Sequence, residues 1–594
     1  MNDSYSSLPA LFYDACFKGE SFYFAFKKNK EWIKYSGEKL LEKLEYLYLA
    51  FRQHGITKGT AVGIIANSSP EWILSDLAIQ ICGGITVPLL PLIASENFLY
   101  EKEDARISVL IIDEKEKLEP EIQKILSAFS QVFQIETTVS KDTNTFFFEE
   151  LFLTGKNLKT NDSFSELKKN IEQIQSEDIF SIIYTSGSMG RPKGVPLTHR
   201  NILSQFQALH PILKLNNTQD KALSVLPVAH IFERMVIYFF AYEKIPVYFG
   251  KDPRLLKSLL NEVKPTLMTV VPRLLERLYE GILQLTRESK FIRKWLLGHA
   301  IRFALTNNPK NNPKNKKKFY HYFFHFLVYK KILKQLNPEF RYLISGSSAL
   351  NKNICRFFLN IGIPICEGYG MTECAPVIAL NTEESAHIGS VGKVLPGVEI
   401  RFGEHQEILV RGENVFKGYY NYGISNELFF TEDGFFKTGD CGYLNPDGYL
   451  FLSGRLKEML KTSTGKYVSP LPIENALALH PLIEAACIIA NNRKFVSALI
   501  FIRKEVAMQL LNVEKEVFSL EKASLSRRIQ ATVKKEIEKT NNHLNYWEQI
   551  KKWIIIPETP SVENGLLTPT LKLKRNVVQK KYEEQIELLY SDSK

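Results

Sequence analysis

The sequence predicts an α/β protein with a large N-terminal lobe of α/β subdomains, a small β-barrel-like part and a small, mobile C-terminal α+β domain. Three observations favour this class. Short apolar runs alternate with amphipathic stretches through the first three-quarters of the chain. From about residue 390 the pattern changes to short strands separated by turns, and after Arg455 a smaller unit follows with its own strands and helices.

The apolar runs of the first part are short enough to be buried strands. They are AVGIIA (61–66), SVLIID (108–113), IFSIIYTSG (179–187), PVYFG (246–250) and RYLISG (341–346). Amphipathic segments between them read as helices. In residues 70–84, Pro70 suits a first helical turn and the pair Gly83–Gly84 suits the end.

The later part contains a strong hairpin signal, because Asp447–Gly448 is flanked by apolar residues. A chain of 594 residues is too long for one compact core. We therefore expect a domain boundary near Lys457, which gives an N-terminal domain of residues 1–456 and a C-terminal domain of residues 457–594.

Composition narrows the protein class. Hydrophobic residues make up 45% and charged residues 24%, which is typical of a globular protein and excludes a disordered or fibrous chain. The net charge of +11 favours acidic partners, such as anionic lipid, nucleotide, nucleic acid or an acidic carrier protein. The seven cysteines are scattered without CxxC spacing, so we expect a reducing, cytoplasmic setting.

No targeting or spanning segment is expected. The first residues have no apolar core of a signal peptide. No stretch approaches the roughly 20 apolar residues that cross a bilayer. The sequence predicts a protein that is soluble or peripheral to a membrane.

Residues 184–194 carry the clearest chemical motif, Tyr-Thr-Ser-Gly-Ser-Met-Gly-Arg-Pro-Lys-Gly, directly after the apolar run IFSII. Glycines and small residues let backbone N–H groups approach phosphate oxygens, hydroxyls add donors, and Lys193 adds a charge. The Walker A pattern is not met, because Gly194 follows Lys193 where that pattern requires Ser or Thr. The motif predicts a phosphate loop of another kind; a plain surface loop is the alternative.

A second motif, EGYGMTECAP, occupies residues 367–376 after another short apolar strand. Tyr369 can stack on a base, the Thr372 hydroxyl can bind phosphate, and the Glu373 carboxylate can hold Mg²⁺. The alternative is a polar turn at the end of a strand.

Two further elements lie towards the C-terminus. Asp440, in Thr-Gly-Asp, can bind two ribose hydroxyls, and Arg455, in SGRLKE, can support the same sugar. Lys572 follows in LTPTLKLKR (567–575), where a solvated surface lysine is the alternative.

In this order and spacing, the four elements resemble the adenylate-forming superfamily of AMP-binding enzymes, which includes acyl-CoA synthetases, peptide-synthetase adenylation domains and luciferases. The resemblance covers about residues 20 to 580 and extends to the long-chain acyl-CoA synthetase branch. The segments that carry it are NSSPEWILSDLAIQICGGITVPLLP (67–91), LPVAHIFER (226–234), VPRLLERLY (271–279), LVYKKILKQLNPEFRYLISGSSAL (327–350) and LTPTLKLKR (567–575).

The resemblance implies a reaction and its partners. ATP, with Mg²⁺, activates a long-chain fatty acid as an acyl-adenylate, and the acyl group then passes to the thiol of CoA. The implied location is the cytoplasm, or the cytoplasmic face of a membrane.

The resemblance also implies roles for individual residues. It places phosphate binding at Thr185, Ser186, Gly187, Ser188, Gly190 and Lys193. It places the adenine pocket at Ser345, Gly346, Ser347, Ser348, Glu367, Gly368, Tyr369, Gly370 and Met371. Phosphate and Mg²⁺ contacts fall to Thr372, Glu373 and Thr185, and ribose contacts to Asp440 and Arg455. His230 would lie near the substrate carboxylate; a structural histidine at a helix start is the alternative.

A rotating C-terminal domain is implied as well. Lys572 would contact carboxylate and phosphate oxygens during adenylation, Lys457 would be the hinge, and Lys461 with Gly465 would form the face for the thiol step. Met189 departs from the family, because a threonine usually stands there in the phosphate loop.

Two other functions stay open at this stage. One is an acyl–carrier-protein synthetase with the same adenylate chemistry, which residues 368–381 and the basic surface favour. The other is a catalytically inactive, membrane-associated scaffold. Nucleic acid is not an expected partner, because no nucleic-acid-binding module is recognisable.

One segment has a biased composition. Between Lys290 and Lys334 there are twelve Lys or Arg residues and no Asp or Glu, and residues 319–329 are all aromatic, aliphatic or His. Eleven such residues cannot span a bilayer, but they can lie in the headgroup region of an anionic membrane. The alternative is that Phe319, Tyr322, Phe323 and Phe326 pack into the protein core.

Overall fold

The structure is a computed structural model of the chain. It describes residues 5–19, 22–136, 144–185, 191–252, 255–287, 291–307, 315–336, 339–382, 387–513, 516–561, 563–567 and 573–591. The chain divides into two compact units. The first comprises Met1–Arg401, Leu409–Lys437 and Leu444–Phe451, and the second Phe402–Ile408, Thr438–Tyr443 and Leu452–Lys594. The boundary expected near Lys457 stays a prediction.

Among the described residues, the first unit contains a seven-stranded sheet of order β7-β6-β5-β3-β4-β8-β9. Its strands are β3 (Ala61–Ile65), β4 (Ile85–Leu89), β5 (Val109–Ile112), β6 (Gln131–Gln134), β7 (Thr145–Phe147), β8 (Ile179–Thr185) and β9 (Lys193–Thr198). All neighbours pair in parallel except β8 and β9, which are antiparallel.

A nine-stranded sheet of order β16-β15-β14-β13-β12-β10-β11-β1-β2 is the second sheet described in this unit. Its strands are β1 (Tyr23–Lys28), β2 (Glu31–Ser36), β10 (Ala222–Ser224), β11 (Val247–Phe249), β12 (Leu267–Val270), β13 (Tyr342–Ser345), β14 (Ile365–Gly370), β15 (Val377–Asn381) and β16 (Lys393–Val394). The strands from β14 to β1 run parallel, with antiparallel strands at the two ends.

The five apolar runs predicted as strands correspond to β3, β5, β8, β11 and β13, so these predictions are confirmed. Helix α3 (Pro70–Ile81) confirms the helix expected over residues 70–84. Ser69 caps its start by accepting from the Trp72 N–H, and Pro70 occupies the first turn. Gly83, just after its end, has a φ of 80°, which favours glycine.

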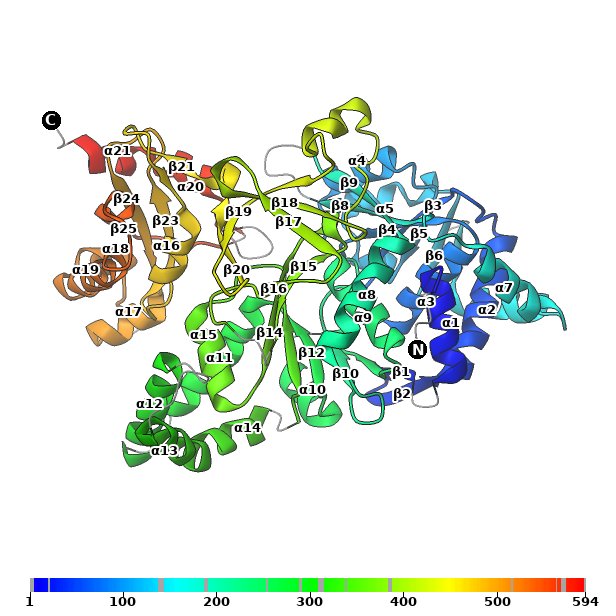
Figure 1. Ribbon diagram of the computed structural model, residues 1–594, viewed down its shortest axis with the longest axis horizontal. Helices are drawn as coiled ribbons and strands as arrows, with labels where there is room; N and C mark the ends of the chain where they lie inside the picture. The colour runs from blue at the N-terminus through cyan, green and yellow to red at the C-terminus, as the bar shows by residue number, and fades with distance from the viewer. Residues whose placement is uncertain are drawn as a thin grey trace. The chain divides into compact units, whose positions relative to one another are not determined.

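Helices surround both sheets of the first unit (Figure 1). They are α1 (Leu8–Lys18), α2 (Gly37–Gln53), α4 (Ser95–Asp104), α5 (Pro120–Lys124), α6 (Phe148–Leu158), α7 (Ser163–Gln173), α8 (His199–Leu213), α9 (Ile231–Tyr242), α10 (Leu256–Val263), α11 (Pro272–Arg287), α12 (Phe291–Thr306), α13 (Asn315–Phe324), the π-helix η4 (His325–Tyr329), α14 (Lys330–Leu336) and α15 (Lys352–Ile361). Helices α3 and α9 join the two sheets, since Arg234 of α9 bonds to Asp76 of α3 and to Ser181 of β8.

One part of the fold prediction is wrong. The small β part is a four-stranded sheet of order β17-β18-β19-β20 whose first and last strands do not pair with each other, so it is not a closed barrel. Its strands are β17 (Val398–Phe402), β18 (Glu407–Gly412), β19 (Phe436–Leu444) and β20 (Leu450–Arg455). Small closed barrels whose interiors side chains fill have about eight strands, so four are too few. The hairpin at Asp447–Gly448 is confirmed between β19 and β20.

The second unit has its own core around a three-stranded sheet of order β23-β24-β25. Its elements are η8 (Leu456–Glu458), β21 (Leu460–Lys461), β22 (Tyr467–Val468), α16 (Pro470–Leu477), β23 (Ile483–Ile489), β24 (Val496–Ile502), α17 (Lys504–Leu511), α18 (Leu520–Leu525), α19 (Arg527–Asn541), β25 (Ile550–Ile556), α20 (Arg575–Lys581) and α21 (Glu583–Ser591). In the part of the chain that the structure describes, no helix combines the length and the apolar composition needed to cross a membrane.

Candidate active site

The predicted phosphate loop connects β8 to β9. Thr185, at its start, pairs with Lys193, at its end, and the Thr185 hydroxyl donates to the Lys193 carbonyl at 3.5 Å. The loop residues Ser186, Gly187, Ser188 and Gly190, together with Met189, lie outside the described residues. The hairpin therefore fixes both ends of the predicted loop on adjacent strands.

The ammonium of Lys193 lies against three aromatic rings that the sequence did not single out. Its Nζ is 3.9 Å from the ring centre of Phe429, 4.7 Å from that of Tyr419 and 5.0 Å from that of Tyr422. Ring faces attract cations at such distances. The segment that carries the rings is joined to β9, because the Tyr420 N–H donates to the Gly194 carbonyl at 2.8 Å. We call these three rings the aromatic cage.

Tyr419 also connects Lys193 to the predicted metal ligand. Its hydroxyl donates to Glu373 Oε1 at 2.8 Å, and Glu373 is buried. Burial and the neighbouring carboxylate raise the pKa of Tyr419, so the phenol keeps its proton as the donor. Glu373 lies in a short 3-10 helix, η5 (Thr372–Cys374), that follows β14. The structure thus brings Lys193 and Glu373 together, from two different sheets.

The Glu373 carboxylate fits a Mg²⁺ ion. Mg²⁺ is usually held by one or two carboxylates together with substrate phosphates, and an oriented carboxylate supplies such a hard oxygen. No group of three or more His, Cys, Asp or Glu side chains suited to a metal occurs among the described residues. A site that relies on phosphate oxygens does not need one.

The predicted adenine pocket falls at the carboxyl ends of β13 and β14. Ser345 and Glu367 are neighbours across these strands. The Ser345 hydroxyl is buried and has no hydrogen-bond partner among the described residues. Because buried polar groups are normally paired, this hydroxyl suits contact with a polar ligand. Tyr369, predicted to stack on the base, is buried within β14.

Glu367 is a buried carboxyl at the same strand ends. Its Oε1 accepts a hydrogen bond from the Leu350 N–H at 3.0 Å. Burial nevertheless raises its pKa to about 7. The carboxyl can therefore exchange a proton near neutral pH.

Helix α9 carries His230 to this region. His230 is the N-cap residue of α9, and the Phe232 ring packs over Gly346, so closely that a Cβ there would lie 3.0 Å from the ring. A side chain at position 346 would therefore need the Phe232 ring to shift. His230 is exposed to solvent on one side, and the protein around the rest of its ring lowers its pKa by desolvation, which favours the neutral imidazole at pH 7. The predicted acyl-site histidine and the turn at residues 345–348 are neighbouring elements.

Glu233, in the first turn of α9, is a buried carboxyl that the sequence did not single out. It is fully buried and accepts hydrogen bonds from the hydroxyls of Ser224 in β10 and Thr269 in β12. Desolvation outweighs these bonds and raises its pKa to about 7 from the usual 4.5. A Glu normally faces solvent, but α9 is apolar at nearly every other position, and this composition was the local signal that the helix is buried.

Glu233 gives a testable pH dependence. A carboxyl whose pKa is raised by folding contributes stability below pH about 4.5, and this contribution is lost as the pH rises through about 7. Glu233→Gln imitates the protonated acid and does not ionise. We expect the variant to gain up to about 3 kcal/mol in unfolding free energy relative to wild type between pH 5 and pH 8. Urea unfolding at both pH values measures the difference, and a constant difference would contradict the assignment.

The second unit holds other predicted residues. Arg455 Nε donates to Asp440 Oδ1 at 3.1 Å, so the predicted ribose pair is assembled. Lys457 lies in η8. Lys461 ends β21, and Gly465, with a φ of 81°, lies in the turn to β22. Lys461 and Gly465 of the predicted thiol face therefore lie in one small hairpin, and the predicted hinge residue Lys457 lies just before it.

Lys572 lies outside the described residues. The residues on either side of its loop, Leu567 and Leu573, form an antiparallel bridge. Lys574 caps α20 and its N–H donates to the Leu566 carbonyl at 2.8 Å.

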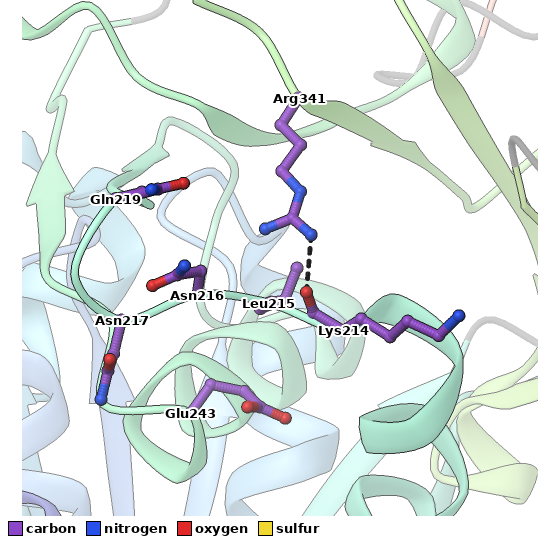
Figure 2. A pocket seen from close by; sticks show the side chains of 7 residues that line it. All are labelled: Lys214, Leu215, Asn216, Asn217, Gln219, Glu243 and Arg341. Atoms are coloured by element: carbon purple, nitrogen blue, oxygen red, sulfur yellow. Dashed lines mark hydrogen bonds between the residues drawn. The ribbon is translucent and has the colours of Figure 1, made fainter.

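A polar depression elsewhere in the first unit does not belong to this site. It has a volume of about 410 Å³ and is lined by Lys214, Leu215, Asn216, Asn217, Gln219, Glu243 and Arg341. Figure 2 shows the Arg341 guanidinium turned to the Lys214 carbonyl, to which it donates at 2.6 Å. The lining residues precede β10, β11 and β13, at the amino ends of these strands. Ligands of open α/β sheets bind at the carboxyl ends, where the residues above lie.

Comparison with known proteins identifies the family. The AMP-binding enzyme model matches residues 16–420, and the AMP-binding enzyme C-terminal domain model matches residues 457–594. Long-chain-fatty-acid–CoA ligase FadD15 of Mycobacterium tuberculosis is 30% identical, over 90% of this chain and 89% of the relative. Long-chain-fatty-acid–CoA ligase ACSBG2 of Xenopus laevis is 28% identical, over 96% of this chain and 81% of the relative.

Solved structures share the fold. O-succinylbenzoate CoA synthetase (MenE) from Bacillus subtilis, in complex with AMP, superposes with a TM-score of 0.67 at 19% identity, over 96% of this chain and 97% of that one. ATP-bound MatB from Rhodopseudomonas palustris superposes with a TM-score of 0.67 at 20% identity, over 98% and 99%.

The matching family models and the curated relatives define the chain as a ligase. The chain belongs to the AMP-binding enzyme family, and the predicted resemblance to the adenylate-forming superfamily is confirmed.

Proposed function

We propose that this ligase uses ATP to activate a long-chain fatty acid as an acyl-adenylate and then transfers the acyl group to the thiol of CoA. The relatives named above are long-chain-fatty-acid–CoA ligases that align over most of the chain. The observation that carries the proposal is the Lys193–Tyr419–Glu373 arrangement, because it places a cation and a hard carboxylate at the end of the predicted phosphate loop.

The first half-reaction needs such groups. A carboxylate oxygen attacks the α-phosphorus of ATP, pyrophosphate leaves, and a mixed anhydride forms. Negative charge gathers on the phosphoryl oxygens in the transition state, so cations and N–H donors fixed in advance lower its energy. Lys193 supplies one cation. Mg²⁺, held by Glu373 and Thr185, would neutralise phosphate charge. Ser345 and the Asp440–Arg455 pair would bind the nucleoside.

His230 would act near the carboxylate of the acyl substrate, and Glu367 would act near the base of the nucleotide. A neutral imidazole at His230 accepts or donates a hydrogen bond without repelling a cation. In the second half-reaction the thiol sulfur attacks the acyl carbon and AMP leaves. We propose that Lys572 serves the adenylation step, that Lys461 and Gly465 form the face for the thiol step, and that the chain turns at Lys457 between them.

Pyrophosphate exchange with a panel of acids tests the substrate class. We expect Mg²⁺-dependent ATP–pyrophosphate exchange that is faster with dodecanoate through octadecanoate than with acetate or an amino acid. An amino acid or an aryl acid as the best substrate would contradict the proposal. Absence of exchange with every acid would support an inactive scaffold instead.

The same panel identifies the acceptor. The adenylate formed by the best acid is offered to CoA and to purified acyl carrier protein in parallel. Thioester formation with CoA supports the proposal. Thioester formation with the carrier protein alone would assign the enzyme as an acyl–carrier-protein synthetase.

The proposed location is the cytoplasm, with peripheral contact to the cytoplasmic face of a membrane. A soluble ligase would meet its long-chain substrate mainly where that substrate partitions. The residues that support this contact are described below.

A further inference from the structure

Three large aromatic side chains of α13 and η4 point into solvent. Tyr322 is 72% exposed, Phe326 is 72% exposed and Phe323 is 42% exposed. Their spacing of one and four residues puts them on the same side of a helix. We call these three residues the aromatic face. The alternative that these three side chains pack into the protein core is therefore wrong. The side chain of Phe319, the fourth residue of that alternative, lies outside the described residues.

The opposite side of the same segment is fixed to the protein. Phe324, Val328 and Tyr329 are buried. The Phe324 ring contacts the Phe303 ring of α12 with centres 5.5 Å apart, and the Tyr329 hydroxyl donates to the Ala300 carbonyl at 2.7 Å. The helical segment that carries the aromatic face is therefore folded and packs against α12. Figure 1 shows α12, α13 and α14 together at the margin of the first unit.

Basic residues continue the same helical segment. Lys330, Lys331 and Lys334 of α14 are exposed, and Lys330 follows Phe326 by one helical turn. Arg302 of α12 is exposed too. Because the sequence from Lys290 to Lys334 has no Asp or Glu, nothing within it neutralises these charges. A partner for this surface must be anionic and must accept aromatic rings.

We propose that the aromatic face and the lysines beside it dock reversibly on an anionic lipid surface. Aromatic rings favour the headgroup region, where their apolar bodies leave water, and lysines reach lipid phosphates and carboxylates. Exposed aromatic side chains that are grouped on one side of a helix, and not scattered singly, indicate an interaction site. A second copy of the chain is a poor occupant, because its exposed basic residues Arg302, Lys330, Lys331 and Lys334 would face the same four cations.

The docking proposal extends the proposed function, but it does not depend on it. If the substrate is a long-chain fatty acid, the surface would hold the enzyme where this substrate is concentrated. The attraction itself comes from rings and charges, so it exists for any substrate. Each lysine near an anionic membrane contributes about a fivefold gain in partitioning. Three lysines then give on the order of 100-fold.

Vesicle co-sedimentation of the full chain tests the docking. We expect wild type to bind phosphatidylcholine vesicles that contain phosphatidylserine, to bind pure phosphatidylcholine weakly, and to dissociate as salt rises from about 0.01 M to about 1 M. Lys330→Gln/Lys331→Gln/Lys334→Gln should lose on the order of 100-fold in partitioning. Tyr322→Ser/Phe326→Ser should lose binding with little change in its salt dependence.

Matched controls separate this surface from general stickiness. Phe17 and Val517 are 70% and 72% exposed on other elements, so Phe17→Ser/Val517→Ser should bind as wild type does. ATP–pyrophosphate exchange with dodecanoate in the absence of vesicles should be unchanged in all variants, which shows that they fold. Failure of exchange in wild type would contradict the proposed function and leave the vesicle result intact.

Three results would overturn the docking proposal. Wild type could fail to sediment with anionic vesicles at low salt. The aromatic and lysine variants could bind as well as wild type. The protein could be a dimer in sedimentation equilibrium that Tyr322→Ser/Phe326→Ser dissociates, which would assign the face to a second copy.

Discussion

Glu373→Gln is expected to lower the rate of ATP–pyrophosphate exchange by on the order of 10²–10³, the typical cost of losing one well-placed electrostatic group. Glutamine keeps the size of the side chain and can still accept from the Tyr419 hydroxyl, so the fold should be retained. It removes the negative charge that a metal ion requires. When the exchange rate is measured over a range of Mg²⁺ concentrations, it should increase less with Mg²⁺ in the variant than in wild type.

Variants of the aromatic cage separate the hydrogen bond from the rings. Tyr419→Phe keeps the ring over Lys193 and removes the 2.8 Å bond to Glu373, so we expect about a tenfold loss. Tyr422→Phe keeps its ring 5.0 Å from Lys193 and serves as the matched control with little change. Equal losses in both would show that the hydrogen bond is not the cause. Full exchange in Glu373→Gln would remove Glu373 from the proposed site.

Strands of the first unit could be predicted because they are buried on both faces. The run IFSIIYTSG became β8, and four of its seven strand residues are buried. A parallel strand covered on both sides needs apolar residues at every position, so the signal is local and continuous. The phosphate-loop motif could be located for the same reason, since it directly follows β8.

The aromatic cage could not be predicted in this way. Tyr419 and Tyr422 lie in a segment with turn residues, KGYYNYG, whose local pattern indicates only a loop. Their contact with Lys193 depends on the bond from Tyr420 to Gly194, which are far apart in the chain. The one available signal was the density of tyrosines in this short segment, which is unusual for a solvated loop.

The contacts of buried carboxyls could not be predicted from the sequence either. Glu233 lies in a helix whose apolar sequence indicates burial, but its partners Ser224 and Thr269 come from two separate strands and could not be predicted. Helical periodicity likewise placed Tyr322, Phe323 and Phe326 on one side without showing whether protein covers that side. In both cases the outcome depends on packing between distant segments.

The largest expected loss of stability concerns a buried ion pair. Arg234 and Asp76 have fully buried side chains. Arg234 Nε donates to Asp76 Oδ2 at 2.9 Å, and its other nitrogens donate to Asp76 and to Ser181. The Tyr238 hydroxyl also donates to Asp76. The pair therefore links α9 beside the nine-stranded sheet to α3 and β8 of the seven-stranded sheet.

Asp76→Ala should lower the free energy of unfolding by about 3–5 kcal/mol, because it leaves the Arg234 charge buried without its counter-ion. The guanidinium lies 5.2 Å from the Trp72 ring centre, so urea unfolding followed by tryptophan fluorescence reports on this region. Glu166→Ala is the matched control: it breaks an ion pair with Arg52 whose side chains are 46% and 49% exposed, and it should cost about 0–1 kcal/mol. Arg234→Met combined with Asp76→Ala should cost less than the sum of the two single changes, since no unpaired charge then remains. If Asp76→Ala costs no more than Glu166→Ala, the two sheets are held together by apolar packing and not by this pair.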